Sequence, residues 1–339
     1  MPYLSGDLRS WSSRIARGAA VLIVVAVVSG ALYQNVLLAR DRRANPMPGQ
    51  LIDVGGYRMH IYCAGQGSPP VILDSGQGDS YISWRKVQPE IAKFVSVCSY
   101  DRVGLGYSEP SPRPSTSRVF AEELHELLDA AGVAPPYILV AHSFGGFNVR
   151  LFASRYRSET AGMVLVDSGH PDQPKRMPQQ LRMNAEFVRQ GKLLQFTEPI
   201  GIPRLLGDCG DSAAIRAAEC TFNHMRESTT ELEMVGESAN EVGAAGDLGD
   251  MALIVISHDT SQRRPDLPEE LDRTRNQVWA QMQQELSHLS TNGTLVIAKG
   301  SGHDVQNQRP EIVIEAVHNV VNRAREKSAS PERDRDQKR

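Results

Sequence analysis

The stretch that most constrains the fold of this chain runs from Tyr137 to Gly146. It opens with an apolar run typical of a buried strand and ends in two glycines, after which a helical pattern begins. Ser143 lies between the two, so we expect a sharp turn with the serine hydroxyl at its apex. The small residues Ala141 and Gly145 on either side would permit such a turn. A serine in an ordinary strand-to-helix loop, or at a helix cap, is the alternative that the rest of the chain must decide.

Strand-like apolar runs alternate with helical patterns over most of the chain. This alternation predicts a mainly parallel sheet with helices on both faces. Between residues 170 and 249 the alternation stops, and helical patterns rich in Met, Gln, Arg and Glu take over. We therefore predict that a helical cap is inserted into an α/β core. The predicted strands lie at residues 51–54, 58–63, 70–74, 94–100, 137–142, 162–167, 251–257 and 293–299.

The N-terminal segment differs from the rest in composition. Residues 18–32 are apolar almost throughout, and several arginines precede them. A basic lead followed by an apolar core fits either a signal peptide or a membrane anchor. Continued to Leu38, the stretch approaches the roughly 20 residues that span a bilayer. We favour a transmembrane anchor, with a secreted form cleaved near residues 29–31 as the alternative.

The remaining composition narrows the function classes. The net charge of −3 gives no indication of a nucleic-acid partner. No Cys-x-x-Cys or His-Glu-x-x-His pattern is present in the sequence, so we predict neither a metal nor a cofactor. All four cysteines follow the apolar segment, and an even number beyond a translocation signal suits an oxidising compartment. We expect the domain after residue 44 to be extracytoplasmic, either periplasmic or extracellular.

Four features in chain order together resemble the α/β-hydrolase superfamily, over about residues 50–325. Ser-Gly-Gln-Gly at 75–78 follows the third strand, and Asp-Arg-x-Gly-x-Gly-x-Ser at 101–108 follows the fourth. The turn at Ser143 is close to the family's Gly-x-Ser-x-Gly motif. Ser-Gly-His at 301–303 follows the last strand. The resemblance implies an eight-stranded sheet flanked by helices, with a helical cap.

This organisation divides the chain into five parts. Residues 1–44 form the basic segment with the anchor or signal, and residues 45–169 form the first part of the core. The cap covers 170–249, and the core resumes at 250–325. The charged residues 326–339 are expected to be a disordered tail.

The resemblance also implies a catalytic triad. A serine hydroxyl needs an adjacent base, and His303 stands in the loop where the family carries that histidine. The acid has two candidates. Asp167 follows the strand just beyond the Ser143 helix, which is one place where the family carries an acid. Asp259 follows the first strand after the cap, slightly earlier than the family's more usual offset. We select Asp167 and keep Asp259 as the alternative.

Two backbone N–H groups complete the implied site. In the family, the oxyanion donors are the residue after the nucleophile, here Phe144, and a residue after the third strand, here Gln77. The family's strand order also places the second strand beside the fourth, so Cys63 and Cys98 could form a disulfide. Cys209 and Cys220, both in the cap, could form another.

The function implied is hydrolysis of a small-molecule carboxylic ester through an acyl-enzyme, with the cap selecting the substrate. Amidase, lactonase, carbon–carbon hydrolase, acyltransferase and haloperoxidase activities are alternatives, because the fold hosts all of them. A non-catalytic binding protein with this fold is an alternative from a different class. The membrane is the predicted partner of the N-terminal helix, and no sequence feature predicts an oligomeric state.

Overall fold

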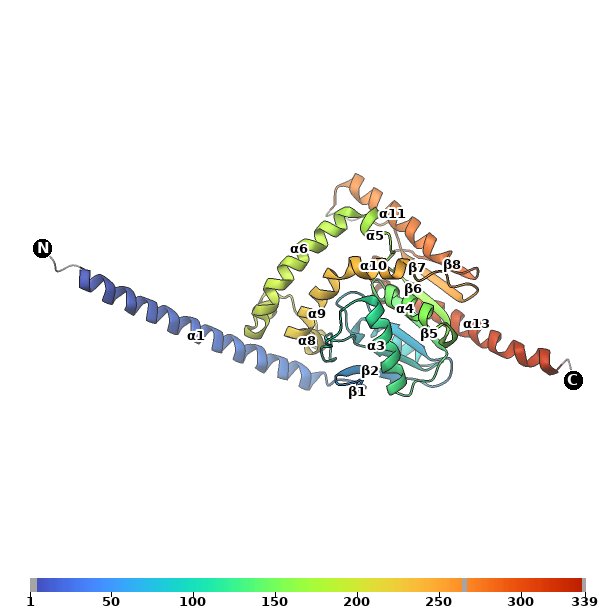
Figure 1. Ribbon diagram of the computed structural model, residues 1–339, viewed down its shortest axis with the longest axis horizontal. Helices are drawn as coiled ribbons and strands as arrows, with labels where there is room; N and C mark the ends of the chain where they lie inside the picture. The colour runs from blue at the N-terminus through green and yellow to red at the C-terminus, as the bar shows by residue number, and fades with distance from the viewer. Residues whose placement is uncertain (1–4, 264–266, 337–339) are drawn as a thin grey trace. The chain divides into compact units, whose positions relative to one another are not determined.

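The computed structural model describes residues 5–263 and 267–336 (Figure 1). The chain divides into two compact units. The larger unit contains residues 47–191 and 223–339, and the smaller contains residues 1–46 and 192–222. Each unit is described separately below.

The larger unit is built on one eight-stranded sheet in the order β1-β2-β4-β3-β5-β6-β7-β8. The pairs β1–β2 and β2–β4 are antiparallel, and all the others are parallel. The predicted fold, a mainly parallel α/β sheet of eight strands, is confirmed. The strands are β1 (Gln50–Asp53), β2 (Arg58–Ala64), β3 (Val71–Asp74), β4 (Val97–Tyr100), β5 (Tyr137–His142), β6 (Thr160–Val166), β7 (Ala252–His258) and β8 (Gly293–Ala298).

Helices cover both faces of this sheet, and a hydrophobic core lies on each side. Side chains of α3, α4 and α10 share one core with the sheet, and those of α2 and α13 share the other. A central parallel strand is therefore covered on both faces, which explains why every residue of β5 is buried. The helices are α2 (Gln88–Ile91), α3 (Ser117–Ala130), α4 (Gly145–Arg155), α5 (Gln173–Arg176), α6 (Pro178–Leu194), α9 (Phe222–Glu233), α10 (Val235–Gly243), α11 (Glu269–Ser287), α12 (Val305–Gln308) and α13 (Pro310–Asp336), with 3-10 turns η1 (Tyr81–Trp84) and η2 (Arg157–Glu159).

The C-terminal tail differs from the sequence prediction. We predicted disorder from residue 326, but α13 continues as a helix to Asp336. Lys327 forms an ion pair of 2.7 Å with Asp250, on the loop before β7. The physical reason is that Ala, Glu, Lys and Arg are strong helix formers, so a charged segment that extends an existing helix needs no new nucleus.

The smaller unit contains α1 (Ser5–Ala44), η3 (Gln195–Ile200), α7 (Ile202–Leu206) and α8 (Ala213–Glu219). Residues 11–44 form a helix that is long and apolar enough to cross a membrane, and none of its most apolar window is buried inside the protein. A core helix would be buried there. The predicted cap is one continuous segment, residues 170–249. The structure groups part of it, residues 192–222, with α1.

Both disulfide pairings suggested by the sequence are present. Cys63 and Cys98 lie directly opposite each other on the antiparallel strands β2 and β4, and they are bonded. In the smaller unit, Cys209 is bonded to Cys220, which closes the loop between α7 and the end of α8.

Candidate active site

Ser143 stands at a strained turn between β5 and α4. Its φ of +50° lies in the left-handed region, which a residue with a side chain occupies only when the surrounding structure forces it to. Two glycines make the bend sterically feasible. A Cβ on Gly145 would lie 2.6 Å from the carbonyl oxygen of Ser75, and one on Gly146 would lie 1.8 Å from the hydroxyl of Ser168. The sequence thus dictates a tight turn with Ser143 at its apex.

A chain of hydrogen bonds leads from Ser143 through His303 to Asp167. The Nε2 atom of His303 lies 3.0 Å from the Oγ of Ser143, and its Nδ1 lies 2.6 Å from Oδ2 of Asp167. Asp167 directly follows β6 and is completely buried, whereas the His303 side chain is 44% exposed. Strands β5 and β6 are parallel neighbours, so their carboxyl ends bring Ser143 and Asp167 to the same edge of the sheet.

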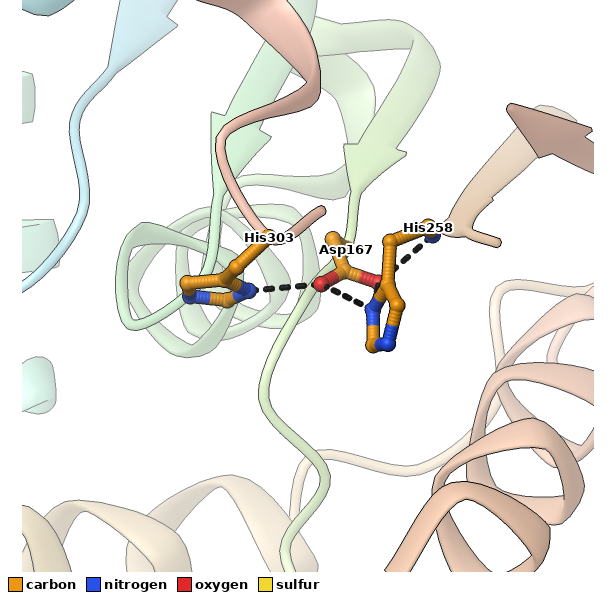
Figure 2. A group of neighbouring side chains, drawn as sticks. All are labelled: Asp167, His258 and His303. Atoms are coloured by element: carbon orange, nitrogen blue, oxygen red, sulfur yellow. Dashed lines mark hydrogen bonds and ion pairs between the residues drawn. The ribbon is translucent and has the colours of Figure 1, made fainter. Parts of the chain in front are cut away.

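Asp167 accepts hydrogen bonds from two further residues. His258 donates through its backbone N–H at 2.9 Å and its ring Nδ1 at 2.7 Å, and the indole Nε1 of Trp279 lies at 2.8 Å. Figure 2 shows His258 and His303 flanking the carboxylate. The aspartate therefore has four donors arranged around its two oxygens.

These contacts set the proton affinities in the site. Burial disfavours the charged form of Asp167, but the hydrogen bonds from His258 and His303 outweigh burial and hold its pKa far below the ordinary value. For His303, burial lowers the pKa, but the hydrogen bond and negative charge of Asp167 reverse this and raise it above the ordinary 6.5. A buried carboxylate that stays ionised can thus stabilise an imidazolium at position 303.

The alternative acid, Asp259, lies elsewhere. It lies at the surface in a half-buried position, where its carboxylate accepts from the hydroxyl of Ser261 at 2.6 Å and from the backbone N–H of Gly300 at 2.9 Å. These bonds lower the pKa of Asp259 without involving His303. Among the described residues, Asp167 is the carboxylate that contacts the histidine.

Gln77 and Phe144 line the same cavity as Ser143. Phe144 caps the N-terminus of α4, where the helix dipole favours a negative charge. Within the described part of the chain, the backbone N–H groups of both residues lack a protein acceptor, although the side chain of Gln77 donates to the carbonyl oxygen of Ser228 at 2.6 Å. These two N–H groups are the candidate oxyanion donors predicted from the sequence.

A buried ion-pair cluster holds the turn that carries Gln77. The guanidinium of Arg102 donates to Oδ1 of Asp74 at 2.7 Å and to both oxygens of Glu231 at 2.6 and 2.9 Å. It also donates to the carbonyl oxygens of residues 75 and 76 in the turn, and Glu231 accepts from the N–H of Gly78 at 2.8 Å. The turn is thereby tied to α9. No pattern in the sequence predicts a role for Glu231.

The cavity in front of Ser143 has a volume of about 560 Å³. Residues of α5, α6, α9 and α10 form much of its wall, so the cap contributes the surface that a substrate would contact. Both apolar and amide side chains line it. The lining residues are Gln77, Ser143, Phe144, Phe147, Gly169, Gln173, Met177, Gln180, Asn184, Phe187, Ser228, Thr229, Leu232, Val235, Arg275, Trp279 and His303.

One group among the described residues has metal-ligand types close together, namely Asp167, His258 and His303, whose ligand atoms lie within 4.8 Å of one another. Each histidine nitrogen nearest the carboxylate is already within hydrogen-bond distance of it. Hydrogen bonds to the carboxylate account for the close approach of these three side chains.

Sequence reasoning missed His258 and Trp279 as partners of Asp167. A signal for His258 was available, because it ends the strand β7, whose carboxyl end lies beside that of β6 in a parallel pair. No comparable signal exists for Trp279, because it reaches Asp167 from α11, far along the chain.

Comparisons with known proteins agree with this architecture. A family described as the alpha/beta hydrolase fold matches residues 69–199. The Cif epoxide hydrolase from Acinetobacter nosocomialis superposes with a TM-score of 0.65 at 13% identity, covering 86% of this chain and 96% of that one. A thermophilic esterase from Thermogutta terrifontis superposes with a TM-score of 0.57 at 19% identity, covering 81% and 98%.

A curated protein from Schizosaccharomyces pombe, itself uncharacterized, is 30% identical over 247 residues. The match covers 70% of this chain and 43% of that protein. The chain has the fold of the α/β-hydrolase superfamily.

Proposed function

We propose that this protein is a serine hydrolase that cleaves a carboxylic ester, with Ser143 as nucleophile, His303 as general base and Asp167 as the acid of the triad. The observation that carries the proposal is the continuous hydrogen-bond chain from Ser143 Oγ through His303 to a buried, ionised Asp167. Such a chain activates a serine that is otherwise a weak nucleophile at neutral pH.

The proposed reaction follows from this geometry. As Ser143 Oγ attacks the ester carbonyl, its proton moves to Nε2 of His303, and Asp167 stabilises the imidazolium. The developing oxyanion is met by the backbone N–H groups of Phe144 and Gln77. His303 then returns the proton to the leaving alcohol, which leaves an acyl group on Ser143. A water molecule, deprotonated by His303, hydrolyses that acyl-enzyme.

The identity of the nucleophile supports an ester over the chemistry of some structural neighbours. The superposed proteins include an epoxide hydrolase and an esterase. In this fold, epoxide opening uses an aspartate nucleophile, whereas the strained turn here presents a serine. The cavity of about 560 Å³, with mixed apolar and amide walls, suits an acyl group of medium size.

We further propose that α1 anchors the protein in a membrane, with the hydrolase domain on the extracytoplasmic side. The apolar, unburied window of α1 and the two disulfides support this placement.

The test is labelling with a fluorophosphonate probe, followed by a series of p-nitrophenyl esters of increasing chain length. We expect wild-type protein to be labelled and the Ser143→Ala variant to remain unlabelled. Ser154→Ala is the matched control, because that exposed serine on α4 lies outside the residues that line the cavity and its loss should leave labelling intact. Absence of label in folded wild-type protein would favour a non-catalytic binding protein instead.

A further inference from the structure

The smaller unit exposes an unusual set of apolar side chains outside α1. Leu193, Phe196, Leu205 and Leu206 are between 65% and 68% exposed. Single exposed hydrophobic residues are common, but a cluster of large ones in one short segment marks an interaction surface. We refer to residues 193–206 as the apolar cap segment.

This segment is packed directly on α1. A Cβ on Gly30 would lie 2.5 Å from the carbonyl oxygen of Ile200, so the helix approaches η3 as closely as only glycine allows. Three residues further along α1, the ring of Tyr33 lies against Gly201, where an added Cβ would come within 2.9 Å of it. The start of α7 therefore lies at the level of Tyr33 along the helix.

Polar contacts continue the same interface beyond Tyr33. Gln34 is buried and donates to the carboxylate of Glu198 at 2.5 Å. Two turns later Asp41, also buried, forms an ion pair of 2.6 Å with Arg204. Because these buried polar groups pair with one another within the unit, specific bonds fix the position of the apolar cap segment on α1.

The depth of this interface in a bilayer follows from the apolar stretch of α1. Residues 18–38 extend over about 30 Å along an ideal helix, which matches the roughly 30 Å thickness of a hydrocarbon core. Tyr33, which is 37% exposed, lies in the last part of this stretch, near the boundary that tyrosine favours. The exposed Arg40 and Arg43 then fall in the headgroup layer, where anionic lipids attract them.

We propose that the apolar cap segment lies on the membrane that α1 spans, with Leu193, Phe196, Leu205 and Leu206 in contact with lipid. The inference rests on the membrane anchoring proposed above. It assigns lipid as the occupant because the surface begins beside Tyr33 and Gly201, where the lipid-facing side of α1 reaches the interface. Contact with lipid would remove these exposed apolar side chains from water, as it does for an interfacial helix.

The test uses the full chain, reconstituted in vesicles of phosphatidylcholine and phosphatidylglycerol, with an environment-sensitive fluorophore on one introduced cysteine. All four native cysteines are disulfide-bonded, so only the introduced thiol reacts. Leu206→Cys reports on the segment, and Phe196→Cys is a second, independent position. Asp211→Cys is the matched control, because it is an exposed polar position in the same unit. Val24→Cys marks the bilayer interior.

We expect spin-labelled lipids to quench the probes at positions 206 and 196 at least twofold more than the probe at 211, and aqueous iodide to show the reverse order. Iodide quenching at 206 and 196 equal to that at 211 would overturn the proposal. Shielding of both positions from iodide and from lipid would overturn it as well, since it would indicate a second copy of the chain. A probe at 24 that lipid does not quench would refute the anchor itself, while fluorophosphonate labelling tests the hydrolase separately.

Discussion

The proposed mechanism depends on the carboxylate of Asp167 more than on the other contacts of His303. Two histidines and a tryptophan donate to it, although a catalytic triad requires only one of these donors. The other donors stabilise the negative charge of Asp167 and also fix the orientation of its carboxylate. The pKa of His303 therefore depends on how far those donors offset the charge that Asp167 presents to it.

Replacing Asp167 with asparagine should remove most of the activity. We expect kcat to fall by about 10⁴-fold, because an amide neither holds the imidazole in the correct tautomer nor stabilises the imidazolium. Ester turnover by purified protein measures this, with Asp259→Asn as the matched control. Unchanged turnover in Asp167→Asn combined with its loss in Asp259→Asn would reverse the assignment of the acid.

The pH dependence should reveal the influence of His258. The base must be neutral, so kcat/KM should rise with pH through a midpoint above 6.5, because Asp167 raises the pKa of His303. In His258→Leu, one donor to Asp167 is lost, more negative charge faces His303, and the midpoint should move to higher pH. His258→Asn retains a donor near the Nδ1 position and should restore the wild-type midpoint. A lower rate in His258→Leu with no shift of the midpoint would mean that His258 acts only in packing.

The turn after β3 and helix α9 belong to different parts of the fold, but buried charges join them. Arg102, which follows β4, binds both the turn and Glu231 on α9. The oxyanion donor proposed at Gln77 lies on this turn. Its position therefore depends on an ion pair between the core and the cap.

Breaking this ion pair should destabilise the protein and slow catalysis. In Glu231→Gln, the guanidinium of Arg102 stays buried with less compensation, and such losses cost about 3–5 kcal/mol. Asp250→Asn breaks an exposed pair with Lys327 and should cost under about 1 kcal/mol. Urea unfolding compares the two, and kcat should fall in Glu231→Gln alone. Equal unfolding midpoints in both variants would show that the buried pair contributes nothing beyond an exposed one.

The strands could be predicted from sequence because their physical signal is local. Each is a short apolar run, and the run at β5 is buried throughout. Ser143, His303 and Asp167 could be selected because the chain resembles the α/β hydrolases, and each of the three follows a strand end at the edge where a parallel sheet gathers them. The contacts of Trp279 and Glu231 could not be predicted, since both approach from helices whose positions depend on tertiary packing.

Local sequence patterns do not predict the division into two units, because the division depends on contacts between residues far apart in the chain. The apolar character of α1 was evident, but its buried Gln34 and Asp41 are matched by residues far along the chain, Glu198 and Arg204. Polar residues within a long helix gave no indication of these partners. We propose from the same contacts that the helix is retained in the mature protein.

Retention of α1 can be checked directly. We expect the protein to stay in the membrane fraction after alkaline carbonate extraction, because an unburied apolar helix of this length favours the bilayer. N-terminal peptide mapping should recover residues that precede 29–31. A soluble protein whose first residue lies near Ala31 would instead show that the segment is a cleaved signal.

The central claim, that Ser143 is an activated nucleophile, is tested most directly by mapping where an organophosphate attaches. Wild-type protein is treated with a fluorophosphonate at neutral pH, digested and analysed by mass spectrometry. The account predicts one adduct per chain, on the peptide that contains Ser143, and a strong reduction of that adduct in His303→Ala. An adduct on another residue, or ester turnover by folded protein whose Ser143 remains unmodified, would contradict it.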